Sequence, residues 1–186
     1  MGKTIMGAVV SLDGFMADDN DGVGPLFDWL GNGEVAWSFP GSDDEDGVGP
    51  LFDWLVNGDV PWMTNGWDGQ PAAGEHVFVV THHPPTDWEY ADTAPVTFVD
   101  GVEKAITAAK EFAGGRVGDV AAGQIGGQAL RLGLIDQVVV NQVPVVFGSG
   151  RPFFATGALA EPLLLENPTT IVQGDRVTHL VYDVRR

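Results

Sequence analysis

The stretch Val120-Ala121-Ala122-Gly123-Gln124-Ile125-Gly126-Gly127-Gln128 decides the fold class of this chain. Small and apolar residues lead into a glycine, and Ile125, Ala129 and Leu132 then recur at helical spacing. A strand that enters a glycine turn and then a helix is the building unit of parallel α/β sheets. The free N–H groups at such a helix start can bind a phosphate, and equally the glycines can serve close packing of the helix on the sheet.

The segments on both sides of this unit continue the alternation of strands and helices. Apolar runs predict strands, a 3.6-residue period after a capping-box spacing at Asp100–Glu103 predicts a helix, and Gln173–Arg176 predicts a hairpin turn. The predicted strands cover residues 3–12, 76–81, 96–99, 119–122, 137–147, 162–172 and 177–184. We therefore predict one α/β domain over residues 1–186, with a largely parallel sheet and a C-terminal antiparallel hairpin.

Length and composition fit one soluble globular domain. The chain has 186 residues, 44% of them hydrophobic, and no cysteine, which excludes disulfides, thiolate metal sites and cysteine nucleophiles. No apolar run approaches the roughly 20 residues that a membrane-spanning helix needs. Because the first ten residues are typical of a strand and not of a signal peptide, we expect a cytoplasmic protein.

The charge is strongly acidic and unevenly distributed. The net charge is −17, and no Lys or Arg stands between Lys3 and Lys104, a stretch that holds 19 Asp and Glu. Such a chain is repelled by nucleic acid and by anionic lipid, so we expect neither a nucleic-acid partner nor a membrane partner. An anionic ligand would have to be met by backbone N–H groups or by the C-terminal half.

A near-exact repeat occupies the early part of the chain. Residues 21–37 recur at 46–62 with 14 of 17 identities. Each copy is rich in Gly, Pro, Asn and Asp around a short apolar island, which predicts a turn, one helical turn and a second turn. We interpret 21–62 as a duplicated loop segment. Ser42, Asp44, Asp46, Gly47 and Asp53 approach the spacing of a calcium loop but lack its terminal Glu, so no metal site is predicted.

Two further strand ends carry residues that could take part in chemistry. Asp13, just after the first strand, could donate a proton or accept an N–H of a heterocycle, and Asp before Gly is equally ordinary turn chemistry. Thr81-His82-His83 ends a second strand. Tandem histidines point to opposite sides of an extended chain, so a two-His metal site is not expected, whereas one of them could lie near a phosphate.

Four segments together resemble the dihydrofolate reductase-like family, in the bacterial branch related to the reductase domain of riboflavin-biosynthesis enzymes. They are Gly7–Ala17, Val77–His82, Val120–Asp136 and Val143–Phe154, and they occur in the family's order. The resemblance covers about residues 3–17 and 63–186. It implies a three-layer α/β sandwich with a mixed sheet, and a homodimer.

The resemblance also implies a function and a set of site residues. It implies NADPH-dependent reduction of a small heterocycle of the pteridine or pyrimidine type, with the cofactor carrying the difficult step. NADPH phosphates would lie at Gly123, Gln124, Ile125 and Gly126, and its adenosine end near Thr81 and His82. Asp13 would be catalytic, and Ser11, Phe15 and Trp67 would contact substrate.

One departure from the family pattern keeps a second function open. Family members carry a helix and then a strand ending in a Gly-Arg-x-Thr-like turn, where this chain carries the second repeat copy without a basic residue. A missing inner strand would need a substitute, for which residues 60–63 are one candidate. The alternative function is a catalytically weak or inactive homo-oligomeric binding protein on the same fold.

Overall fold

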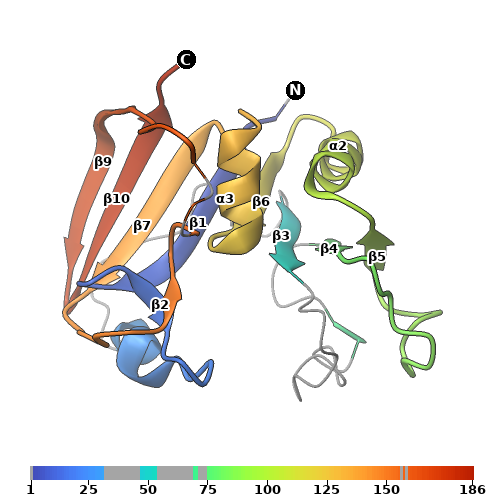
Figure 1. Ribbon diagram of the computed structural model, residues 1–186, viewed down its shortest axis with the longest axis horizontal. Helices are drawn as coiled ribbons and strands as arrows, with labels where there is room; N and C mark the ends of the chain where they lie inside the picture. Colours follow the sequence, from blue (N-terminus) through green and yellow to red (C-terminus); the bar gives the residue numbers. More distant parts are fainter. Residues whose placement is uncertain (1, 32–46, 54–68, 71–74, 156, 158) are drawn as a thin grey trace.

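The structure is a computed structural model that describes residues 2–31, 47–53, 69–70, 75–155, 157 and 159–186 (Figure 1). An eight-stranded sheet has the order β5-β4-β3-β6-β1-β7-β10-β9, and β2 and β8 form a separate two-stranded sheet. The strands are β1 (Thr4–Ser11), β2 (Phe15–Ala17), β3 (Gly47–Asp53), β4 (Val77–Val80), β5 (Val96–Val99), β6 (Val117–Ala121), β7 (Gln137–Val143), β8 (Arg151–Pro152), β9 (Leu165–Gly174) and β10 (Val177–Val184). The helices are the 3-10 helix η1 (Gly24–Gly31) and the α-helices α2 (Val102–Ala113) and α3 (Gln124–Arg131).

The sheet is parallel from β5 to β7 and antiparallel at its C-terminal edge. The β9–β10 hairpin turns at Asp175 and Arg176, and Arg176 adopts a left-handed φ of 60°. This confirms the predicted α/β fold with a terminal antiparallel hairpin. The predicted strand 137–147 is shorter than expected and ends at Val143, because Pro144 has no N–H to donate to a ladder.

The second repeat copy supplies the inner strand that family members carry in this region. β3 lies between β6 and β4, with Val48 opposite Gly118 and Phe52 opposite Val79. The prediction of a turn and a helical turn for this copy is therefore wrong. Pro50 is tolerated because the register shifts by one residue between Val48 and Leu51, and proline is accepted at such a bulge. The other candidate for this strand, residues 60–63, lies outside the described residues.

Two faces of the sheet are covered by different elements, which gives three layers. On one face, α2 and α3 bury the main core, in which Met6, Val120 and Ile125 are fully buried (Figure 1). On the other face, η1 places Leu26 against Val9 of β1. Successive residues of β1 point to opposite faces, so Met6 and Val9 belong to the two separate cores.

The start of α2 differs from its predicted cap. The spacing Asp100–Glu103 predicted a capping box, but the N-cap residue is Gly101, with a φ of 107° and no side-chain cap. Asp100 instead binds His82 across the end of β4. The spacing in the sequence favoured a cap by Asp100. In the fold, the carboxylate of Asp100 instead pairs with His82, a contact that the spacing could not reveal.

Candidate active site

The turn after β1 is organised by Asp13, whose carboxylate holds a second loop. Oδ1 of Asp13 accepts the Ser11 hydroxyl at 2.6 Å and the N–H of Phe147 at 3.2 Å, and Oδ2 accepts the N–H of Gly148 at 2.7 Å. Oγ of Ser11 in turn accepts the N–H of Phe15 at 2.8 Å. Ser11 is fully buried, whereas Asp13 is exposed. The carboxylate thus ties the β1 turn to the loop that follows β7.

These hydrogen bonds decide the charge of Asp13. The Ser11 hydroxyl, aided by the N–H groups of Gly148 and Phe147, holds the pKa of the Asp13 carboxyl below its usual value. Hydrogen bonds to the ionised form favour that form. At neutral pH Asp13 is therefore a fixed acceptor, and it has no proton to donate.

The turn after β6 differs from the Asp13 turn in its hydrogen bonds. The first three residues of α3 are Gln124, Ile125 and Gly126, and their N–H groups have no acceptor among the described residues. N–H groups in a first helical turn have no partner within the helix, and they favour an anion. This turn therefore presents three backbone N–H groups that can bind a ligand, whereas the donors of the Asp13 turn already form hydrogen bonds within the protein.

Glycine is required twice in the turn after β6, for different reasons. Gly123 has a φ of 84°, and a Cβ there would lie 3.0 Å from Cε of Met16. A Cβ on Gly126 would lie 2.5 Å from Sδ of Met6 and 2.9 Å from the carbonyl oxygen of Ala121. Gly126 thus lets α3 pack closely on the sheet, and Gly123 makes the left-handed turn.

A single backbone segment joins the two turns. The N–H of Phe153 donates to the carbonyl of Gly14 at 2.9 Å, and the N–H of Gly123 donates to the carbonyl of Phe153 at 2.8 Å. Phe153 is buried and lies just after β8. Asp13 and the open amides of α3 therefore lie at one edge of the sheet, at the carboxyl ends of the neighbouring strands β1 and β6, where open α/β sheets bind their ligands.

The predicted adenosine-end residues lie two strands further along the same edge. Thr81 is buried, and its Oγ1 accepts the N–H of His83 at 3.0 Å. His82 is exposed, and its Nδ1 lies 2.5 Å from Oδ1 of Asp100, just after β5. The structure thus separates this group from the Gly123 turn by the width of β3.

Solved structures of riboflavin-biosynthesis proteins share this fold. A putative riboflavin biosynthesis protein from Shewanella sp. PV-4 matches with a TM-score of 0.73 and 24% identity, over 99% of both chains. The riboflavin biosynthesis reductase Rib7 of Saccharomyces cerevisiae matches with a TM-score of 0.58 and 15% identity, over 100% of this chain and 89% of its own. The chain has the fold of riboflavin-biosynthesis reductases.

The dihydrofolate reductase-like architecture expected from the four segments is thereby confirmed at the level of the fold. RibD of Acinetobacter baumannii shares it with a TM-score of 0.58 and 12% identity, over 100% of this chain and 58% of RibD. No family model and no curated protein matches the sequence.

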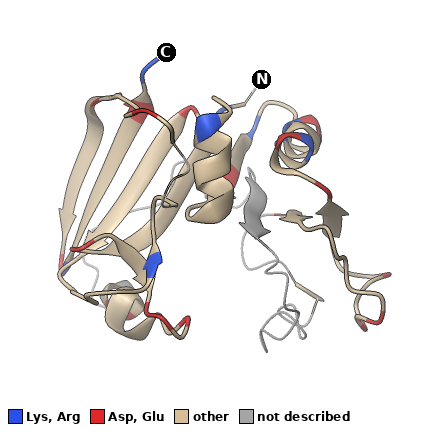
Figure 2. Cartoon of the chain, in the orientation of Figure 1, with Lys and Arg blue, Asp and Glu red and all other residues tan. Residues whose placement is uncertain are grey.

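The described loop that follows β1 carries acidic side chains and no Lys or Arg. Figure 2 shows most Lys and Arg toward the end of the sheet where both termini lie, whereas Asp and Glu lie at both ends. Arg151 of β8 is paired with Asp21 through its Nε at 2.6 Å. Arg151 lowers the pKa of the Asp21 carboxyl in return. Its charge is thus already balanced at the site.

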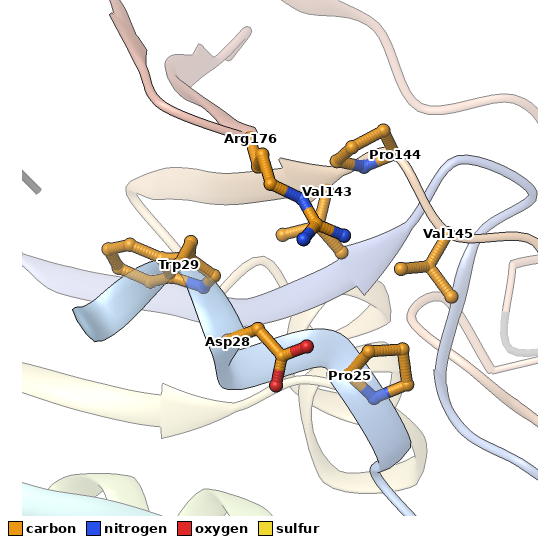
Figure 3. A pocket seen from close by; sticks show the side chains of 7 residues that line it. All are labelled: Pro25, Asp28, Trp29, Val143, Pro144, Val145 and Arg176. Atoms are coloured by element: carbon orange, nitrogen blue, oxygen red, sulfur yellow. The ribbon is translucent and has the colours of Figure 1, made fainter. Parts of the chain in front are cut away.

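A shallow hollow beside η1 is separate from this site. It is lined by Pro25, Asp28, Trp29, Val143, Pro144, Val145 and Arg176 (Figure 3). Trp29 packs edge-on against His179 with ring centroids 5.1 Å apart, and Nδ1 of His179 lies 2.6 Å from Oδ1 of Asn141. None of the predicted site residues lines this hollow.

Sequence reasoning found the glycine turn and Asp13 but missed their partners. Phe147, Gly148 and Phe153 act through backbone atoms, which leave no side-chain signal. Asp100 was considered only as part of a helix cap. Trp67 and the acids at 42–46 lie outside the described residues. Among the residues that the structure does describe, no His, Asp and Glu cluster could hold a metal ion, and no helix is long and apolar enough to cross a membrane.

Proposed function

We propose that this chain is an NADPH-dependent reductase of a small heterocyclic substrate of the pteridine or pyrimidine type. The proposal rests on two neighbouring turns. The start of α3 has three backbone N–H groups without an acceptor among the described residues, and the turn after β1 holds the ionised Asp13. Backbone hydrogen bonds of Phe153 connect the two turns. The fold shared with riboflavin-biosynthesis reductases supports the same reaction class. Because that likeness concerns the fold, the site residues carry the argument.

The start of α3 fits the diphosphate of a dinucleotide. The N–H groups of Gln124, Ile125 and Gly126 would hold it, and Gly123 leaves no side chain in the turn. When bound, the reduced nicotinamide supplies the hydride. Because the surroundings are acidic and Arg151 is already paired with Asp21, these backbone N–H groups would supply most of the binding to the diphosphate.

The role of Asp13 follows from its hydrogen bonds. Its ionised carboxylate would accept an N–H of the heterocycle and so orient the ring that receives the hydride. Ser11 keeps the carboxylate ionised and in place, since its buried hydroxyl donates to Oδ1. We propose Phe15 and Trp67 as the remaining substrate contacts.

Equilibrium titration with NADPH, followed by the fluorescence of the six tryptophans, tests the cofactor site. Gln124→Glu places a negative charge at the start of α3, where an acid stabilises a helix but repels a phosphate. We expect binding at least about tenfold weaker, a loss of about 1.4 kcal/mol, with an unchanged or higher melting temperature. The matched control Gln128→Glu, one turn further along α3, should bind as the wild type does. Equal affinities in all three proteins would contradict the assignment.

Asp13→Asn tests the orienting role. We expect turnover to fall at least about tenfold, because the amide lacks the charge that orients the substrate. NADPH affinity should change less than about twofold, because no cofactor contact is removed. Steady-state kinetics and the fluorescence titration measure the two effects. An equal loss of turnover and affinity would mean that Asp13 only holds the two loops together.

A binding protein without turnover is the second candidate, and one observation favours it. Arg151 of β8, the short strand paired with β2, is neutralised by Asp21, and residues 18–75 contain no Lys or Arg and so no Gly-Arg-x-Thr-like sequence. We propose a cytoplasmic homodimer for either function, which sedimentation analysis of the purified chain would check. No fluorescence response at millimolar NADPH would favour the binding protein over the reductase.

A further inference from the structure

The hollow beside η1 is a feature of the molecule that the proposed reaction leaves unused. It lies between η1, the end of β7 and the turn of the β9–β10 hairpin (Figure 3). It holds about 170 Å³ of space, part of it open to solvent, which is the volume of about six water molecules. Any ligand of this hollow must therefore be small.

Two opposite charges face the hollow without neutralising each other. Figure 3 shows the guanidinium of Arg176 on one side of the hollow and the carboxylate of Asp28 on another. Both residues are exposed, and neither side chain forms an ion pair or a hydrogen bond with any other of the described residues. By contrast, Arg151 and Arg185 are each paired with an acid. The hollow therefore presents one positive and one negative charge to its occupant.

The backbone conformation of Arg176 supports a binding role for its side chain. The φ of this residue is 60°, a left-handed value that hairpin turns usually assign to Gly or Asn. A residue with a long side chain is strained in this region, and strained positions cluster at sites that hold ligands. The strain thus points to the guanidinium, and not to the turn itself, as the reason for an arginine at this position.

The walls of the hollow are apolar and hold their shape without a ligand. Pro25, Pro144 and Val145 line one side of it, and the ring of Trp29 lines the other (Figure 3). The two prolines have a fixed φ, and Trp29 packs edge-on against the buried His179. Preformed walls lower the entropic cost of binding, so even a small ligand can be held.

We propose that the hollow binds a small zwitterion, namely a free α-amino acid with an apolar side chain. The guanidinium of Arg176 would hold the carboxylate of the ligand, and the carboxylate of Asp28 would accept hydrogen bonds from its ammonium group. The apolar side chain of the ligand would lie against the walls. A ligand with one charge would leave the opposite protein charge without a partner as water is displaced, which disfavours its binding. This inference goes beyond the proposed reductase function and does not depend on it.

An NMR titration of the full nitrogen-15-labelled chain with L-valine tests the site. We expect the amide signals of Trp29, Val145 and Arg176 to shift with a Kd of about 1 mM, the strength of a few exposed ionic contacts. Isovalerate lacks the ammonium group and isobutylamine lacks the carboxylate, and both keep the branched apolar part. Each of these two analogues should bind at least about threefold more weakly than L-valine, because one ionic contact is lost.

Two variants assign the two charges. Arg176→Gly removes the guanidinium and relieves the left-handed strain, so L-valine affinity should fall at least about threefold while the melting temperature stays level or rises. Asp28→Asn should weaken L-valine binding by a similar factor and leave the affinity for isovalerate unchanged or higher. The matched control Asp175→Asn removes a charge from the same hairpin turn, outside the hollow, and should bind L-valine as the wild type does.

Several results would overturn the inference. They are unchanged signals around the hollow at tens of millimolar L-valine, equal binding of L-valine and isovalerate, and undiminished L-valine binding by Arg176→Gly. Shifts confined to Gln124, Ile125 and Gly126 would also overturn it, because they would place the amino acid at the start of α3. None of these measurements contains NADPH, so each of these results leaves the proposed reductase function standing.

Discussion

Two copies of one heptapeptide, Gly-Val-Gly-Pro-Leu-Phe-Asp, adopt different structures in this molecule. Residues 22–28 enter the 3-10 helix η1 on one face of the sheet, whereas residues 47–53 form strand β3 inside it. Since the seven residues are identical, their local propensities are identical too. Their surroundings in the fold decide the difference.

The surroundings of the first copy favour a compact turn. Leu26 is fully buried against Val9, Val143 and Val177, and its N–H donates to the carbonyl of Val23 at 3.1 Å. Gly24 has a φ of 49°, a left-handed value that glycine adopts without strain. Burial of one leucine thus holds the helical form.

The surroundings of the second copy favour an extended chain. β6 and β4 offer ladder partners on both sides of β3, and a gap between them would leave backbone groups unpaired. Backbone pairing therefore sets the structure of this copy. A Gly- and Pro-rich segment can therefore form an inner strand when the strands on both sides of it need backbone hydrogen-bond partners.

The largest expected effect is that of a proline placed in β3. Phe52→Pro removes a backbone donor from a strand with neighbours on both sides, so we expect a loss of about 3 kcal/mol or more of unfolding free energy. The equivalent change in the first copy, Phe27→Pro, affects a half-exposed position of η1 and should cost less than half as much. Chemical denaturation of both variants measures the difference. Equal losses would mean that β3 is not paired on both sides.

Truncation of the buried Leu26 tests what holds the first copy in its helical form. Leu26→Ala removes a fully buried side chain from the core under η1, and such changes cost about 2–5 kcal/mol. Phe27→Ala, the control in the same helix, changes a side chain that is 46% exposed and should cost less than about 1 kcal/mol. If the two variants unfold at the same denaturant concentration, Leu26 does not anchor the first copy.

A smaller effect comes from Asp119 on β6, the strand that borders β3. Its Oδ1 is buried without a hydrogen-bond partner among the described residues, and burial raises the pKa of its carboxyl to about 7, although the N–H of Val120 acts in the opposite direction. The folded state thus disfavours the charged form, and the unfolded chain ionises first as pH rises. Stability should fall between about pH 4 and pH 7 and then stay level.

Replacing this carboxyl tests that pH dependence. Asp119→Asn should be more stable than the wild type at pH 8 by about 1–3 kcal/mol, and the two proteins should converge near pH 4. Thermal melts at a series of pH values measure the convergence. A variant that is less stable than the wild type at pH 8 would show that the charge of Asp119 is satisfied in the folded protein.

Sequence reasoning succeeded where local pattern and tertiary structure agree. β5 has the predicted bounds 96–99, and α2 follows the predicted helical period, because Val102, Ile106 and Ala109 form its buried face. The glycine turn after β6 was predicted for the same reason. Reasoning failed for the second repeat copy, where backbone pairing with β6 and β4 overrides an unchanged local propensity.

The hydrogen-bond partners of the candidate site residues could not be predicted from the sequence. Asp13 was identified from its place after a strand, and both of its possible roles were left open, because the donors from Phe147 and Gly148 come from a loop more than 130 residues away. Asp100 and His82 stand 18 positions apart, with no periodicity to connect them. Contacts of this kind depend on the order of strands in the sheet, which the sequence pattern did not specify.

The central claim is that backbone amides at the start of α3 hold a dinucleotide. It is tested most directly by the amide NMR signals of the nitrogen-15-labelled protein during a titration with NADPH. We predict that the signals of Gln124, Ile125 and Gly126 shift as NADPH is added, while those of Phe112 and Ala113, at the far end of α2, stay in place. Unchanged signals at the start of α3 at millimolar NADPH would contradict the account.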